Sequence, residues 1–183
     1  MGNERPEGPA DARNRVGLTW NPSSPISART LILAAENRME KIHNALIVCS
    51  PPGLYKTAET LLPEDIEIIV NDHIKSWYFV IRELSIYFKR QGQGSLSLIV
   101  QGINERSTQT DLLGPPAVSC FESFAESILG TARAEESYSI FGFRGIEAGS
   151  EGAAAPWIWK IIDREHKKDS GKWHSFPKIK WLR

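Results

Sequence analysis

The chain has 183 residues, of which 41% are hydrophobic and 24% are charged, a composition typical of one globular domain with a buried core. Lysine and arginine together number 22, as do aspartate and glutamate, so no overall field attracts nucleic acid or an anionic membrane. The two cysteines, Cys49 and Cys120, are too few for a disulfide framework and lie in apolar segments, which favours reduced thiols in a cytoplasmic protein.

The N-terminal residues are predicted to form a mobile tail. Residues 1–14 are polar and rich in glycine and proline, and they precede a single domain over residues 15–183. They lack the apolar core of a signal peptide, and no later apolar run reaches the ~18 residues of a membrane span. Residues 15–20 (RVGLTW) predict a short strand, which the turn-forming pair Asn21-Pro22 ends.

The next segments predict a helix, a buried strand and a long second helix. Ser24 as an N-cap and Pro25 at the first helical position start the first helix. Residues 45–49 (ALIVC) form a continuous apolar run, as expected for a parallel strand that is covered on both faces. Residues 63–90 carry an apolar stripe wide enough to contact a partner helix as well as a sheet.

The remaining chain continues the alternation of strands and helices. A polar loop is predicted over 101–115, and the last strand or extended segment over 172–182. The elements between are strands over 95–100 and 138–143 and helices over 116–134 and 153–167. Crossovers of this length predict an α/β architecture with a parallel sheet.

The order and spacing of these elements resemble the short-chain dehydrogenase/reductase superfamily. Residues 44–52 (NALIVCSPP) stand where the family has a strand ending in Asn-Asn-Ala-Gly, and residues 94–100 match its Gly-x-Ile-Val strand. Asn71 takes the helix position of a structural and catalytic asparagine. The resemblance implies a three-layer, Rossmann-like parallel sheet of about five strands flanked by helices, without the first strand-helix units of the family.

The residues that carry the family's chemistry are replaced. Anchoring the family helix on Phe124-Ala125-Glu126-Ser127 puts Gly114 at its catalytic tyrosine and Val118 at its lysine. Asn104 falls nearest the catalytic serine. A glycine and a valine have no proton to exchange, so general acid–base catalysis loses its groups. The Gly-rich turn that would hold a pyrophosphate is also missing, since Gly92-Gln93-Gly94 precedes a strand instead of linking a strand to a helix.

The resemblance therefore favours a truncated, degenerate member that acts as a non-catalytic scaffold or binding module, with no cofactor. A homo-oligomer through the helices over 63–90 and 116–134, and a protein partner, are the expected associations. The alternative is a residual NAD(P)-dependent oxidoreductase, whose candidate catalytic residues are Asn71, Asn104 and Ser119 and whose candidate cofactor-binding residues are Cys49, Ser50 and Pro51. Without the family's first strands, residues 15–20 must pair beside 45–49 or leave that edge open to another chain.

Two further kinds of site have weaker support. The four histidines have no partners at metal-ligand spacing, so no metal site is predicted. The segment from Pro156 holds four tryptophans and eight basic residues, including Lys178 and Lys180. Such a mixture binds single-stranded nucleic acid in some proteins, but a core helix followed by a closing strand is the favoured interpretation.

Overall fold

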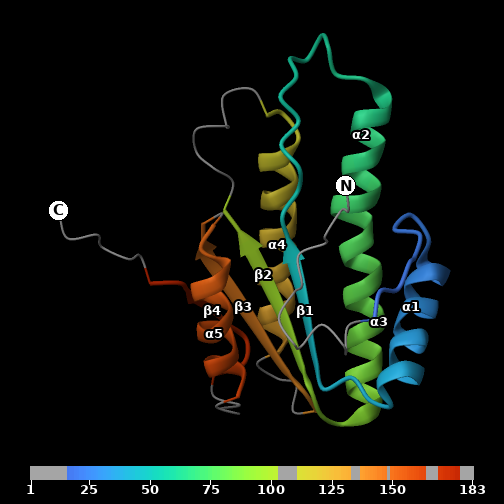
Figure 1. Ribbon diagram of the computed structural model, residues 1–183, viewed down its shortest axis with the longest axis vertical. Helices are drawn as coiled ribbons and strands as arrows, with labels where there is room; N and C mark the ends of the chain where they lie inside the picture. Colours follow the sequence, from blue (N-terminus) through green and yellow to red (C-terminus); the bar gives the residue numbers. More distant parts are fainter. Residues whose placement is uncertain (1–15, 103–110, 133–136, 148, 164–168, 178–183) are drawn as a thin grey trace, which may run out of the picture.

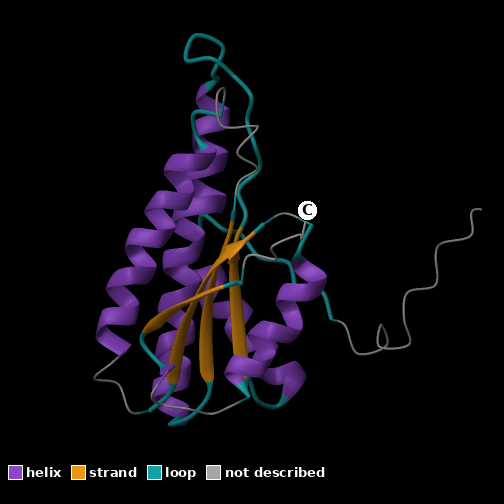
Figure 2. Ribbon diagram, turned by 90° about the vertical axis from the view of Figure 1, so that its left-hand side faces the viewer, coloured by secondary structure: helices purple, strands orange, loops and turns teal. Residues whose placement is uncertain are grey.

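A computed structural model describes residues 16–102, 111–132, 137–147, 149–163 and 169–177. The predicted tail over residues 1–14 lies outside this range. Within it the chain folds into three layers, with the sheet between two layers of helices (Figure 2). The predicted α/β fold with a parallel, Rossmann-like sheet is confirmed.

The sheet holds four strands in the described part of the chain, all parallel and in the order of the sequence. They are β1 (Asn44–Cys49), β2 (Ser95–Gln101), β3 (Ser139–Ile146) and β4 (Lys172–Ser175). Each consecutive pair is joined by a helical crossover, so every strand ends at the same edge of the sheet. β1 and β4 are the outer strands.

The expected fifth strand over residues 15–20 is wrong, because Val16–Trp20 have no strand pairing. The chain there is held by the turn that starts the next helix, in which the Asn21 amide donates to Ser27 Oγ at 2.8 Å. The half-buried Trp20 side chain packs against the main core and lines a hollow with Leu31 and Ile47. Within the described residues the outer edge of β1 is therefore left open, which was the second of the two outcomes expected from the sequence.

One helical layer is formed by α1 (Pro25–Met39), a long helix, and α4 (Gly114–Ala132). Ser24 caps α1 as predicted. The long helix was predicted as one regular element over 63–90, but it consists of α2 (Pro63–Val70), a π-helical turn over Asn71–Lys75, and α3 (Ser76–Gln91). Figure 1 shows these three parts following one another, with α1 beside α3 on the side away from α4.

The opposite face of the sheet is covered by α5 (Glu151–Ile162). This helix packs on β3, where Phe141 and Phe143 form a small core with Ile158 and Ile162. The larger core lies under α3 and α4, where Phe88 and Phe121 are fully buried against Leu96 and Leu98 of β2. No helix among the described residues is long and apolar enough to cross a membrane.

The connection between α1 and β1 depends on one buried hydrogen bond. Tyr87 of α3 is 4% exposed, and its hydroxyl accepts a hydrogen bond from the Ile42 amide at 3.0 Å. This bond ties the start of β1 to the helix that covers it. Removing the hydroxyl leaves a buried amide donor without a partner.

We expect Tyr87→Phe to lower the free energy of unfolding by about 1–3 kcal/mol, the cost of an unsatisfied buried donor. Urea denaturation followed by circular dichroism measures the change. Tyr55→Phe is the matched control, because Tyr55 is 61% exposed and its loss of a hydroxyl should change little. Equal stability of the two variants would show that the Ile42 amide finds another partner.

Candidate functional site

The carboxyl edge of the sheet is where a fold of this kind binds ligands, because the loops after parallel strands gather there. β1, β2 and β3 end side by side at Cys49, Gln101 and Ile146, and the Gly102 amide donates to the Ile146 carbonyl at 2.8 Å. On the α5 side of this edge lies a hollow of about 200 Å³. Its floor is formed by Val48, Ile99 and Ile146.

The walls of this carboxyl-edge hollow are almost entirely apolar. Ala154, Ala155, Ile158 and Trp159 of α5 face the strands across it. The polar lining residues are Gln101 and Glu151, which bind each other through Gln101 Nε2 and Glu151 Oε1 at 2.5 Å. No lysine or arginine of the described chain lines it. It suits a small apolar group and offers nothing to a pyrophosphate.

Helix N-termini at this edge are the other place where a phosphate would bind, through free amides and the helix dipole. Each of the three helices that follow a strand already has a carboxylate of this chain there. Asp65 accepts the Leu62 amide at 2.9 Å at the start of α2, and Asp111 accepts the Gly114 amide at 2.9 Å at the start of α4. Glu151 accepts the Gly149 amide at 3.0 Å beside α5.

These hydrogen bonds also hold two of the carboxylates in the charged form. The Lys56 ammonium and the Leu62 amide lower the pKa of Asp65. The Gly149 amide lowers the pKa of Glu151. Hydrogen bonds to an ionised carboxylate favour it over the neutral acid, so both helix termini keep a negative charge at neutral pH. The groups present therefore do not fit the pyrophosphate of a nicotinamide dinucleotide.

Asp111 was missed by the sequence analysis, which assigned residues 101–115 to a polar loop. Its carboxylate is buried, with the residue 4% exposed, and its Oδ1 accepts the amides of Leu113 at 3.2 Å and Gly114 at 2.9 Å. Its Oδ2 is also buried and has no hydrogen-bond partner among the described residues. The signal was an aspartate three residues before a helix that starts with Gly114 and two prolines.

This carboxylate occupies the space above Gly114. A Cβ added to Gly114 would overlap Asp111 Oδ2 and lie 2.9 Å from Asp111 Cγ. Gly114 is the residue that aligns with the catalytic tyrosine of the resembled family, and Val118, which aligns with the lysine, packs against the main core. The geometry therefore leaves no room for a side chain at the first position and no charge at the second.

The candidate residues from the sequence are not brought together into one site. Asn71 lies in the π-helical turn, where its Oδ1 accepts from Lys75 Nζ at 3.0 Å, whereas Ser119 lies on the exposed face of α4. Asn104 lies outside the described residues. Cys49 is fully buried in the main core, while Ser50 is exposed and Pro51 half-buried in the loop after β1.

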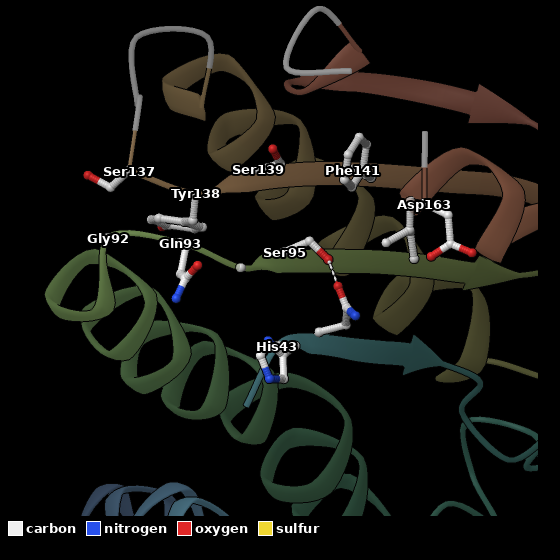
Figure 3. Close-up of a pocket in the computed structure, with 12 residues that line it drawn as sticks. His43, Gly92, Gln93, Ser95, Ser137, Tyr138, Ser139, Phe141 and Asp163 are labelled. Carbon is white, nitrogen blue, oxygen red and sulfur yellow. Dashed lines mark hydrogen bonds between the residues drawn. The ribbon is translucent and has the colours of Figure 1, made fainter. Parts of the chain in front are cut away.

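A larger hollow of about 510 Å³ lies at the opposite, amino edge of the strands (Figure 3). Figure 3 shows Ser95 hydrogen-bonded to the Asn44 side chain, at 2.6 Å, with Asp163 nearby. The carboxyl ends of α3, at Gly92, and of α5, at Asp163, border this hollow. Two helix C-termini and a carboxylate give it a negative potential, which disfavours phosphates. As predicted, Gly92-Gln93-Gly94 joins a helix to a strand.

The remaining predicted alternatives are only partly within the described residues. No group of three metal-ligating side chains occurs in the described ranges. Trp157 packs against Phe143, and Trp173 donates a hydrogen bond to Glu126, so these two tryptophans belong to the folded body of the protein. Lys178 and Lys180, on which the nucleic-acid alternative depended, lie outside the described residues.

Comparison with solved structures shows where this architecture occurs. A short chain dehydrogenase from Mycobacterium smegmatis superposes with a TM-score of 0.69 at 14% identity, over 88% of this chain and 69% of its own. A 3-ketoacyl-(acyl-carrier-protein) reductase from Brucella melitensis, solved with NADH, gives a TM-score of 0.67 at 12% identity, over 85% and 74%. The chain has the fold of the short-chain dehydrogenases.

An NADPH-bound carbonyl reductase from chicken fatty liver superposes less closely, with a TM-score of 0.61 at 9% identity, over 85% of this chain and 72% of its own. No family model matches the sequence, and no curated protein is significantly similar to it. The solved structures therefore show the dehydrogenase fold that the order and spacing of the elements predicted, although neither sequence comparison finds a match.

Asp111 and a side chain at position 114 would compete for the same space. We expect Asp111→Ala to lower the free energy of unfolding by about 0.5–2 kcal/mol, because α4 loses its cap. Gly114→Ala should cost a similar amount, because the new Cβ displaces the same carboxylate. The double variant should cost less than the sum of the two single changes, as a urea-based double-mutant cycle would measure. If the two free-energy changes were strictly additive, the Asp111 carboxylate would not occupy the space above Gly114.

The stability of the fold depends on pH through the buried thiol of Cys49. Burial, with smaller effects from Glu122 and Cys120, raises the pKa of Cys49 from 9.0 to about 12. Between these values the folded chain keeps a proton that the unfolded chain has lost. The contribution of Cys49 is thus fully present below pH 9 and is lost as the pH rises toward the folded pKa.

We therefore expect the stability of the wild type, relative to Cys49→Ala, to fall by up to ~1.4 kcal/mol per pH unit above 9. Denaturation of both proteins at several alkaline pH values gives the difference between their free energies of unfolding. Titrating groups other than Cys49 contribute equally to both proteins and therefore cancel. A difference that stays constant with pH would mean that Cys49 is solvated in the folded protein.

Proposed function

We propose that this protein is a non-catalytic protein with the dehydrogenase fold, which acts as a scaffold or binding module. The observation that carries this proposal is the Asp111 carboxylate, which fills the space above Gly114 where the tyrosine of the related fold would begin. Val118 at the lysine position adds no charge. An enzyme of this class needs an ionisable group at that point to exchange a proton with its substrate.

The electrostatics of the carboxyl edge support the same conclusion. Asp65, Asp111 and Glu151 place a carboxylate at each of the three helix starts where a phosphate would bind, and Asp111 also caps the first amide of α4. The nearby hollow is apolar and lacks a cation among its described lining residues. A dinucleotide would have to displace these carboxylates before its own charge was stabilised. The residual oxidoreductase has no comparable observation in its favour.

The proposed scaffold is a homo-oligomer that associates through α2–α3 and α4. Where α3 meets α4, Tyr78 is 38% exposed and its ring stacks on Phe124 with centroids 3.9 Å apart. Along α4, Ser119, Ser123 and Ser127 are exposed at a spacing of four residues, which places small side chains on one face. A flat surface with an aromatic anchor suits contact with a second helix pair.

The prediction is that NAD, NADH, NADP and NADPH at millimolar concentration leave the melting temperature unchanged. A ligand that binds only the folded state raises it, so binding would be visible as a shift. Light scattering on the same samples should report a dimer. A nucleotide-dependent shift would overturn the non-catalytic proposal and direct attention to substrates.

Two variants test the oligomer directly. Ser123→Arg places a long charged side chain on the exposed face of α4 and should convert the dimer to a monomer without loss of secondary structure. Ala153→Arg is the matched control, because Ala153 is exposed on α5, on the opposite face of the sheet. Equal masses for both variants would place the contact elsewhere.

A further inference from the structure

The outer edge of β1 is open and unprotected. Within the described residues β1 pairs with β2 alone, so the backbone groups on its other side have no strand partner. Its sequence, NALIVC, contains no charge, proline or glycine. Proteins usually protect exposed strand edges with such residues, with short strands or with a covering element. The opposite edge shows this protection, because β4 has four residues, carries Lys172 and is followed by Pro177.

Both faces of the sheet beside this edge are apolar. Leu46 and Val48 are 37% and 51% exposed, and they border the carboxyl-edge hollow formed with α5. On the other face Ile47 borders a second hollow of about 350 Å³, which Trp20 and Leu31 also line. A strand placed next to β1 would therefore have apolar side chains of β1 beside it on both faces of the sheet, with Trp20 and Leu31 on the α1 side.

The helix layer extends further than the sheet does. α3 packs on β1 and β2, and α4 packs on β2 and β3. α1 packs on α3 and has no comparable contact with a described strand (Figure 1). Its Leu31 lines a hollow together with Ile47 of β1, so α1 borders the open edge of the sheet. The structure thus has a helix in place for a strand that the described chain does not supply.

We propose that the open edge of β1 binds an extended apolar strand of a partner polypeptide, which α1 and β1 hold between them. Its chemistry follows from the surroundings: predominantly apolar over about the six residues of β1, because the apolar side chains of β1, Trp20 and Leu31 border it. Backbone hydrogen bonds to β1 supply the affinity, and the side-chain hollows supply the selectivity.

Acidic side chains near the carboxyl end of β1 favour a basic residue at one end of this partner strand. Asp72 borders the hollow on the α1 side, and Glu151 borders the hollow on the α5 side, where its pKa is lowered by the Gly149 amide. Lys and Arg do not line either hollow among the described residues. A basic residue at the end of the partner strand near the carboxyl end of β1 is therefore favoured.

A second copy of this chain does not fit the same place. Two β1 strands paired about a two-fold axis normal to the sheet would keep their helix layers on one face. The second copy would then bring its own α3 over the added strand, where α1 of the first copy already lies. The chain's own residues 1–15 are also unsuitable, because they contain six charged residues and two prolines.

This inference deepens the proposed binding role by naming the kind of partner, and it can fail independently of it. A nucleotide-induced shift would overturn the non-catalytic proposal and leave the open edge unchanged. Failure to bind a strand would leave the replaced catalytic positions unchanged. The two experiments therefore separate the two proposals.

The experiment uses a blocked synthetic peptide with a central run of alternating valine and isoleucine and a lysine at each end. Fluorescence anisotropy measures its binding to the full chain, and hydrogen exchange measures the protection of the β1 amides. We expect saturable binding and slower exchange over Asn44–Cys49 when the peptide is present. The same peptide with proline at its centre should not bind, because it cannot complete the hydrogen bonds.

Two protein variants complete the test. Val48→Lys places a charge beside the edge and should weaken binding about tenfold or more, which corresponds to at least 1.4 kcal/mol. Ile86→Lys is the control, because Ile86 is 48% exposed on α3 and should leave binding unchanged. Absence of binding, equal binding by Val48→Lys, or β1 amides already protected in a dimer of the free protein would each overturn the proposal.

Discussion

The packing of α3 on β1 and β2 is the interaction on which the rest of this structure depends. Trp77, Ile81, Leu84 and Phe88 make one side of α3 apolar over about three turns, and they bury the inward side chains of β2. Burial of this kind contributes on the order of 1.5–3 kcal/mol for each large apolar side chain. It keeps β1 beside β2, and Tyr87 fixes the start of β1 through the Ile42 amide.

The same packing decides what the carboxyl edge can do. Once the strands are held parallel and in register, their ends meet at one edge, and the helices that follow begin there. In this chain Asp65, Asp111 and Glu151 stand at those helix starts. A carboxylate there interacts favourably with the helix dipole and repels a phosphate at the same place. The groups that stabilise these helices thus also make the carboxyl edge unfavourable for an anion.

The two outer strands of the sheet differ in how well their edges are protected from pairing with a further strand. β4 is short, charged and followed by a proline, so it ends the sheet. β1 is uncharged and bordered by apolar hollows on both faces, and α1 borders its open edge. The solved dehydrogenases superpose over 69% to 77% of their own length, so part of each has no counterpart in this superposition.

The sequence alone determined the elements and their order. Apolar runs such as residues 45–49 and the capped helix at Ser24 depend on local patterns, and the structure confirms the parallel α/β fold that these patterns predict. The sequence also placed Gly114 and Val118 at the family's tyrosine and lysine positions, because this alignment depends only on the spacing of residues along one helix. What failed was the pairing of residues 15–20, since strand pairing depends on a distant partner and not on the strand's own pattern.

Tertiary structure alone decided the character of the site. No local pattern shows that the Asp111 carboxylate fills the space above Gly114, because this contact depends on how the loop turns back onto the helix. Nor does any pattern show that Cys49 faces the core while Leu46 and Val48 remain exposed. The continuous apolar run of β1 predicted cover on both faces, but the face with Leu46 and Val48 stays exposed, because the helices that cover a strand lie elsewhere in the chain.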